Sequence, residues 1–113
     1  MEMEIVTMKK ISFNAQNAYS EEKANEFVVT GVPIQCTTSA IEMQYKYVDK
    51  QRTDEITGYK LWFIQKGLNP FTVKFDKKPE LPEFLALVEF EHLTAIEIRS
   101  NVYFKADGLK VVK

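Results

Sequence analysis

Apolar and polar residues alternate along several short stretches of the chain, most clearly between positions 38 and 48. The apolar members of this stretch stand two residues apart and are Ile41, Met43, Tyr45 and Tyr47. Residues two apart share one face of a strand, so the spacing predicts a strand with one buried and one solvated face. Residues 56–66 have the composition of a second long strand. Together they predict an antiparallel hairpin, with the polar residues 49–55 as a long charged loop.

The remaining stretches predict a chain of short strands separated by turns. Strands are expected at residues 5–13, 27–30, 71–75, 88–91, 96–99, 102–106 and 109–112. Ser100-Asn101 and Asp107-Gly108 have the composition of tight turns, and residues 77–82, with two prolines, indicate a loop. Ser20 precedes a polar stretch at residues 21–24 and can cap a short helix, because its hydroxyl accepts a hydrogen bond from a free backbone N–H.

Six to eight strands with at most two short helices indicate an all-β protein. We expect a small antiparallel β-barrel, closed or nearly closed, with a two-sheet sandwich as the alternative. A length of 113 residues fits one domain, spanning residues 1–113. The alternating positions predict the core: Ile41, Met43, Tyr45, Leu61, Phe63, Phe71, Val73, Val88, Phe90, Ile96, Ile98, Val102 and Phe104.

The composition narrows the function classes. Hydrophobic residues make up 45% of the chain, charged residues 27%, and the net charge is −1. This balance is typical of globular proteins, and no overall field attracts nucleic acid or an acidic membrane. The single cysteine, Cys36, cannot form an internal disulfide, and the acidic start Met-Glu-Met-Glu is unlike a signal peptide. We expect a cytoplasmic protein without a membrane partner.

Residues for catalysis or metal binding are sparse. One cysteine and one histidine, Cys36 and His92, do not supply a zinc site, and no sequence context supports them as a nucleophile–base dyad. Glu89, Glu91 and Glu97 occupy positions expected to face water, and the chain has no glycine-rich phosphate loop. The sequence therefore predicts a protein that is not an enzyme and has no metal or cofactor.

Charge is distributed unevenly along the chain. Residues 44–78 contain eight basic and four acidic residues, a balance of +4, whereas residues 79–99 contain five acidic and one basic, a balance of −4. Aromatic residues lie among the basic ones, as in Tyr59-Lys60-Leu61-Trp62. If Tyr59, Leu61 and Phe63 face the core, Lys60, Trp62 and Lys66 share the outer face.

An exposed indole beside lysines can stack a nucleic-acid base while the lysines contact phosphates. This pattern predicts an RNA-binding site formed by Trp62, Lys60, Lys66, Lys46, Arg52 and Lys74. The alternative is that Trp62 is covered by a loop or by a protein partner, and that the lysines only keep the strand soluble. The mixed charge of the whole chain argues against tight nonspecific DNA binding.

The C-terminal segment Val-Tyr-Phe-Lys-Ala-Asp-Gly-Leu-Lys-Val-Val, residues 102–112, resembles a known family. It is similar to the ending of the YdcP-like small proteins of Gram-positive conjugative elements, which carry a Tyr/Phe-x-Lys-Ala-Asp segment. Residues 11–18 (Ile-Ser-Phe-Asn-Ala-Gln-Asn-Ala) and 59–64 (Tyr-Lys-Leu-Trp-Phe-Ile) resemble the PrgU-like proteins of conjugative plasmids.

The resemblance implies a PUA-like β-barrel, which is an RNA-binding fold. It also implies a non-catalytic regulator that limits expression of pheromone-inducible surface adhesins. The alternative role is that of a protein-interaction accessory factor of conjugation, of the kind that supports helicase processivity. No functional residue is carried over from the family, so the proposed site residues rest on this sequence alone.

Overall fold

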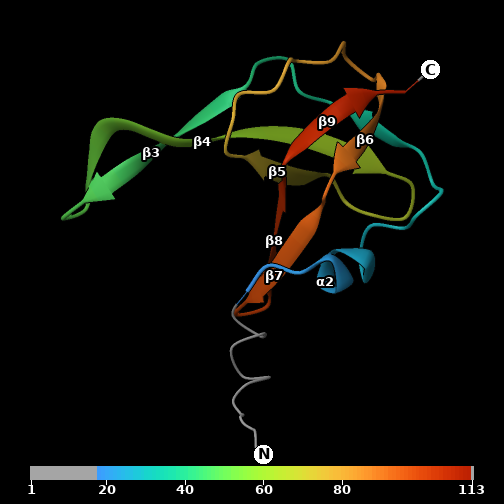
Figure 1. The fold of residues 1–113 in the computed structure, drawn as a ribbon, viewed down its shortest axis with the longest axis horizontal. Coiled ribbons are helices and arrows are strands. Elements are labelled where there is room, and N and C mark those ends of the chain that lie inside the picture. Colours follow the sequence, from blue (N-terminus) through green and yellow to red (C-terminus); the bar gives the residue numbers. More distant parts are fainter. Residues whose placement is uncertain (1–17, 113) are drawn as a thin grey trace, which may run out of the picture.

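The computed structural model describes residues 18–112, which form one short helix and eight strands (Figure 1). The helix is α2 (Glu21–Asn25). The strands are β2 (Ile34–Cys36), β3 (Glu42–Val48), β4 (Gln51–Gln65), β5 (Phe71–Phe75), β6 (Leu87–Glu91), β7 (Thr94–Ile98), β8 (Asn101–Ala106) and β9 (Gly108–Val111). The prediction of a β-rich chain with little helix is confirmed for this part of the chain. The strand predicted at residues 5–13 lies outside the described residues.

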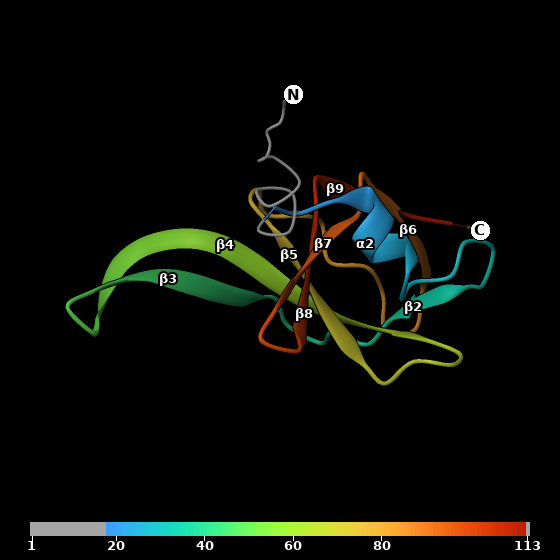
Figure 2. The same ribbon diagram turned by 90° about the horizontal axis from the view of Figure 1, so that it is seen from below.

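The strands form a single sheet in the order β7-β8-β5-β4-β2-β6-β9, with β3 beside the outer part of β4. The path has two ends, so the predicted closed barrel is wrong. The pairs are antiparallel except for β5 and β8, which run parallel. Only His92 and Leu93 separate β6 from β7, and only Asp107 separates β8 from β9. Each of these short links joins strands from opposite ends of the sheet order. The sheet therefore curls around its core (Figure 2), although no hydrogen-bonded pair of strands joins its two ends.

The β3–β4 hairpin was predicted with the wrong connection. Its turn contains only Asp49 and Lys50, which have positive φ of 52° and 69°, and Val48 pairs directly with Gln51. Two successive positive φ values define the tight turn that matches the twist of a hairpin. Residues 51–55, predicted as loop, therefore belong to β4. We call β3 and residues 51–58 of β4 the arm, which projects from the rest of the sheet in Figures 1 and 2.

The core lies under the other half of β4. Leu61 and Phe63 are fully buried with Cys36, Val73 and Phe75. The Phe63 and Phe90 rings meet edge to face, with centroids 4.8 Å apart, a favourable aromatic geometry. Most predicted core positions are confirmed as buried or packed against the core: Ile41, Leu61, Phe63, Phe71, Val73, Val88, Phe90, Ile96, Val102 and Phe104.

Three predicted core positions fail because the strand on which each lies extends beyond the core. Met43 is 49% exposed on the arm, and Ile98 is 47% exposed at the tip of the β7–β8 hairpin. Tyr45 is half-buried, but its ring is covered by the guanidinium of Arg52 and not by the core. The turn of the β7–β8 hairpin is Arg99-Ser100, both with positive φ, one residue earlier than predicted.

The strand predicted at residues 27–30, just after α2, is absent. The helix itself is confirmed: the Ser20 hydroxyl accepts a hydrogen bond from the Lys23 N–H at 3.1 Å. Residues 27–30 continue from it as turns, since the N–H groups of Phe27 and Val28 donate to the Ala24 carbonyl. Phe27 and Val28 pack on the core without joining the sheet, whereas Val29 is exposed.

Gln65 fixes the loop that follows this segment. Its side chain is 3% exposed, accepts from the Val29 N–H at 3.0 Å, and donates to the carbonyls of Val29 at 2.9 Å and Val32 at 3.0 Å. The buried Gln65 amide thus satisfies backbone groups of this loop that would otherwise need a neighbouring strand as hydrogen-bond partner. This arrangement positions the loop that leads into β2, a three-residue strand that the sequence analysis did not predict.

Candidate nucleic-acid interface

Three lysines lie in register across the outer face of the sheet. Lys60 on β4 is paired directly with Lys74 on β5, and Lys74 with Lys105 on β8. Directly paired residues point to the same face, and adjacent strands are about 4.8 Å apart, so the three side chains form a continuous row. We call Lys60, Lys74 and Lys105 the lysine row. Glu42 on β3 pairs with Lys60 and ends the row.

Trp62 lies on the same face, two residues from Lys60, and pairs with Thr72 of β5. Its side chain is held in place. The indole Nε1 donates to Glu42 Oε2 at 2.9 Å, and the Trp62 backbone exchanges hydrogen bonds with the Thr38 hydroxyl. The residue is 39% exposed, so part of its surface remains accessible to a ligand. The predicted arrangement of Trp62 beside a lysine on the outer face is therefore present.

The three lysines have different carboxylate neighbours. Lys60 Nζ lies 3.8 Å from Glu42 Oε1, and Lys105 Nζ lies 3.1 Å from Asp76 Oδ2. Among the described residues, no carboxylate lies within ion-pair distance of Lys74 Nζ. The stem of Lys74 crosses Gly58, where a Cβ would lie 2.5 Å from Lys74 Cε. A glycine at position 58 thus allows the central lysine of the row to lie flat on the sheet.

The rest of the predicted set is not brought to this place. Lys46 and Arg52 lie on the arm, where Lys46 faces Glu55 at 4.0 Å and Arg52 covers the Tyr45 ring at 4.5 Å. Lys66 follows the end of β4 and is exposed. The structure joins Trp62, Lys60 and Lys74 and adds Lys105. The alternation around Lys105 marked it as outward-facing, but only the parallel β5–β8 pairing reveals its neighbours.

The histidine and the cysteine lie in different environments. Cys36 is fully buried in the core, whereas His92 is exposed at the bend between β6 and β7. His92 Nε2 lies 2.8 Å from Glu21 Oε2, and Nδ1 lies 3.2 Å from Asp107 Oδ2. Across residues 18–112, no group of three or more His, Cys, Asp and Glu side chains is placed to hold a metal ion.

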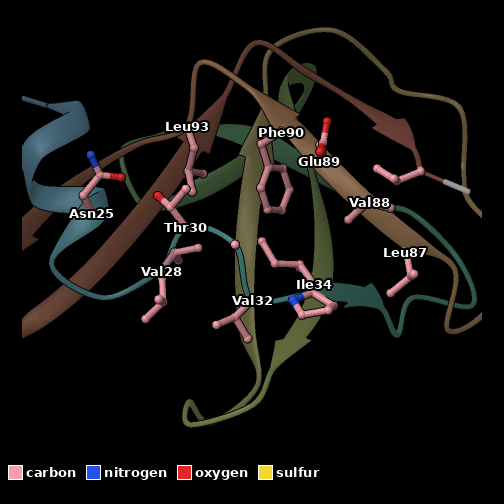
Figure 3. Close-up of a pocket in the computed structure, with 14 residues that line it drawn as sticks. Asn25, Val28, Thr30, Val32, Ile34, Leu87, Val88, Glu89, Phe90 and Leu93 are labelled. Carbon is pink, nitrogen blue, oxygen red and sulfur yellow. The ribbon is translucent and has the colours of Figure 1, made fainter.

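A pocket of about 450 Å³ lies between the loop after α2 and strand β6 (Figure 3). Its walls are mainly apolar and include Val28, Ile34, Val88 and Phe90. Glu89 is the one ionisable residue among those that line it. Acid–base or nucleophilic chemistry requires several convergent polar groups. The pocket therefore offers apolar contact without an evident catalytic arrangement.

Comparison of the chain with protein-family models, with curated proteins and with solved structures finds no match in any of the three. None of the helices within residues 18–112 has the length and apolar character that a membrane crossing requires.

Proposed function

We propose that the protein is a non-catalytic RNA-binding regulator that holds single-stranded RNA across the outer face of β4, β5 and β8. The observation that carries this proposal is the lysine row, aligned in register on three strands, with the partly exposed Trp62 on the same face. Single-stranded nucleic acids are commonly bound by a basic surface that contacts phosphates and an aromatic ring that stacks a base.

The half-buried stems of Lys60, Lys74 and Lys105 support this role. Their methylene groups cover the sheet while the ammonium groups reach solvent, and these groups are then available to phosphates. Lys74 has the strongest case because no described carboxylate competes for it. Glu42, beside Trp62 and Lys60, makes the face less uniformly basic. Such a carboxylate can accept hydrogen bonds from base amino groups, so some base preference is expected.

The biological role within this proposal comes from the family resemblance of residues 11–18, 59–64 and 102–112. It suggests control of the expression of pheromone-inducible surface adhesins on a conjugative plasmid. A relationship to PUA-like domains belongs to the same proposal. Its support is a strongly curved sheet around one core, although the strand path is open.

The test is a titration of fluorescently labelled single-stranded RNA of mixed sequence at several salt concentrations. Trp62→Ala should weaken binding by about fivefold to 150-fold if a base stacks there, equivalent to about 1–3 kcal/mol. Lys74→Ala and Lys105→Ala should each reduce the slope of log K against log salt by about 0.7. Lys66→Ala is the matched control, since it removes the same charge away from the lysine row, and it should bind like wild type.

Two results would contradict the proposal. If wild type binds no RNA at low salt, RNA binding is wrong. If Trp62→Ala and Lys74→Ala bind like wild type, RNA is bound at another surface.

A second candidate is a protein-interaction accessory factor, which the partly exposed Trp62 and the exposed apolar side chains of the arm favour. It predicts loss of a protein partner on Trp62→Ala with little dependence on salt.

A further inference from the structure

Strand β3 has an unpaired edge. It pairs with β4 on one side, and no other strand among the described residues runs along its second side. Outside the β3–β4 ladder, residues 42–48 make no backbone–backbone hydrogen bond within residues 18–112. The Lys46 and Gln44 carbonyls accept hydrogen bonds from the Thr53 and Thr57 hydroxyls, which lie on β4 and not at the free edge. Free edges of this kind pair readily with another strand. Figures 1 and 2 show the arm projecting away from the rest of the sheet, which leaves this edge open to approach.

Several side chains of the arm are apolar and exposed. Tyr47 is 65% exposed, and Met43 and Val48 are each 49% exposed. Contiguous exposed apolar residues on a projecting element commonly mark an interaction surface. The edge therefore combines unpaired backbone groups with apolar side chains that a second strand would cover.

The sequence of β3 complements itself when two copies run antiparallel. With Gln44 of both copies on the two-fold axis, Glu42 of each copy lies opposite Lys46 of the other, and Met43 lies opposite Tyr45. Opposite charges and aromatic–aliphatic pairs directly across strands both stabilise a sheet. We propose that the protein forms a homodimer through antiparallel pairing of the two β3 edges in this register.

A hollow at the base of the arm supports the same register. It has a volume of about 480 Å³ and is lined by residues that include Ala40, Ile41, Met43 and Leu81. In the pairing centred on Gln44, Val48 and Tyr47 of the second copy lie opposite Ala40 and Ile41. The exposed side chains at the tip of one arm would thus meet the hollow of the other.

The neighbouring register is less favourable. Centred on Tyr45, it would place Glu42 opposite Val48 and Lys46 opposite Gln44, so neither charge would face an opposite charge. The charges of Glu42 and Lys46 therefore select the Gln44-centred register. This inference does not rest on RNA binding, although Glu42 also accepts a hydrogen bond from Trp62 and lies beside Lys60 at the end of the lysine row.

The experiment is a charge exchange followed by sedimentation velocity over a concentration series. Glu42→Lys alone, or Lys46→Glu alone, turns both cross-strand pairs into like-charged pairs, so each variant should weaken the dimer about tenfold or more. An equimolar mixture of the two variants should restore it, since the lysines of one chain then face the glutamates of the other. Lys50→Glu, in the turn, changes the charge equally and should dimerise like wild type.

A second measurement covers the case in which a charge variant fails to fold. Gln44→Cys places two thiols together on the axis, close to the separation that a disulfide requires. It should form a covalent dimer under oxidised glutathione, whereas Lys50→Cys should not. The proposal is overturned if wild type is monomeric throughout the series, if both single variants associate like wild type, or if Gln44→Cys and Lys50→Cys crosslink equally.

Discussion

The two halves of β4 belong to one strand but lie in opposite surroundings. From Tyr59 to Gln65 the strand pairs with β5 on one side and with β3 and then β2 on the other, and Leu61 and Phe63 are fully buried. From Gln51 to Ile56 it pairs with β3 alone, and Ile56 is exposed. The polar residues 51–55 of the outer half were predicted as a loop but extend the strand, and only the inner half has the neighbours that form a core.

The ladder differs between the halves as well. The β4–β5 register is continuous over five residue pairs, whereas the β3–β4 register shifts twice. A step of two positions along β3, from Tyr45 to Tyr47, corresponds to a step of four positions along β4, from Ile56 to Arg52. Bulges of this kind twist a ribbon and break the alternation of faces. The comparison teaches that a strand pattern predicts the strand but not how far the core extends beneath it.

The largest expected effect is a difference in unfolding free energy between a variant at the inner half of β4 and a variant on the arm. Phe63→Ala removes a ring that is fully buried and in contact with Phe71 and Phe90, so it should cost about 3–5 kcal/mol of unfolding free energy. Tyr47→Ala, on the arm, should change the unfolding free energy by no more than about 0.5 kcal/mol. Urea denaturation of both variants measures the difference. Equal losses would mean that the arm is part of the cooperative core.

The strands were largely predictable because each carries its own alternation, and the Ser20 cap could be predicted from local chemistry. What failed depended on residues distant in sequence. Residues 27–30 are rich in strand-forming side chains but have their backbone satisfied by the Ala24 carbonyl and by Gln65. The β7–β8 hairpin joins the rest of the sheet through the parallel β5–β8 pair, and no local pattern indicates such a pair.

The second expected effect concerns the buried amide that fixes the loop before β2. Gln65→Leu preserves volume but removes the partners of the Val29 N–H and of two carbonyls, so a loss of about 2 kcal/mol is expected. Gln35→Leu is the control, because it removes a single hydrogen bond, to the Leu85 carbonyl, in an exposed position. Amide hydrogen exchange at Val29 should accelerate only in the first variant. A similar loss in both would show that Gln65 has no special role.

The third effect should be confined to the arm. Asp49→Asn with Lys50→Gly installs the residues that best tolerate two positive φ values, so the turn should gain about 0.5–1 kcal/mol. Hydrogen exchange on β3 should slow, whereas the urea midpoint of the whole domain should stay unchanged if the arm opens independently. A midpoint that rises by the full amount would contradict this independence.

In the candidate site, too, the residues placed correctly are those that depend on the pattern within one strand, and the others depend on pairing between distant strands. Placing Lys60 and Trp62 on one face required only the alternation within β4, and the structure agrees. Lys46 and Arg52 were assigned to the same site because they are near in sequence and basic. They lie on the arm, where Glu55 and Tyr45 are their neighbours. Lys105, distant in sequence, joins the lysine row through pairing alone.

The smallest expected effect concerns the contact between α2 and the inner sheet. Lys23 Nζ lies 3.2 Å from Glu26 Oε1 and 3.4 Å from Glu97 Oε1 on β7. The hydrogen bond to Glu26, with a further one to Glu97, raises the pKa of Lys23 above its ordinary 10.5. A pKa raised on folding contributes stability that is present below pH 10.5 and is lost as pH rises through the folded value.

Lys23→Met should therefore be slightly less stable than wild type at neutral pH, and the difference should shrink above pH 10.5. Because the ion pairs of Lys23 lie at the surface, the effect should be near the limit of measurement by urea denaturation. Lys46→Met, on the arm, is the matched control for losing one positive charge, since its neighbour Glu55 lies within the same two strands. If the Lys23→Met difference persists unchanged at alkaline pH, the ammonium group does not hold α2 against β7. The contact between helix and sheet would then depend on apolar packing, through the buried Ala24 and its neighbours, as the inner half of β4 does.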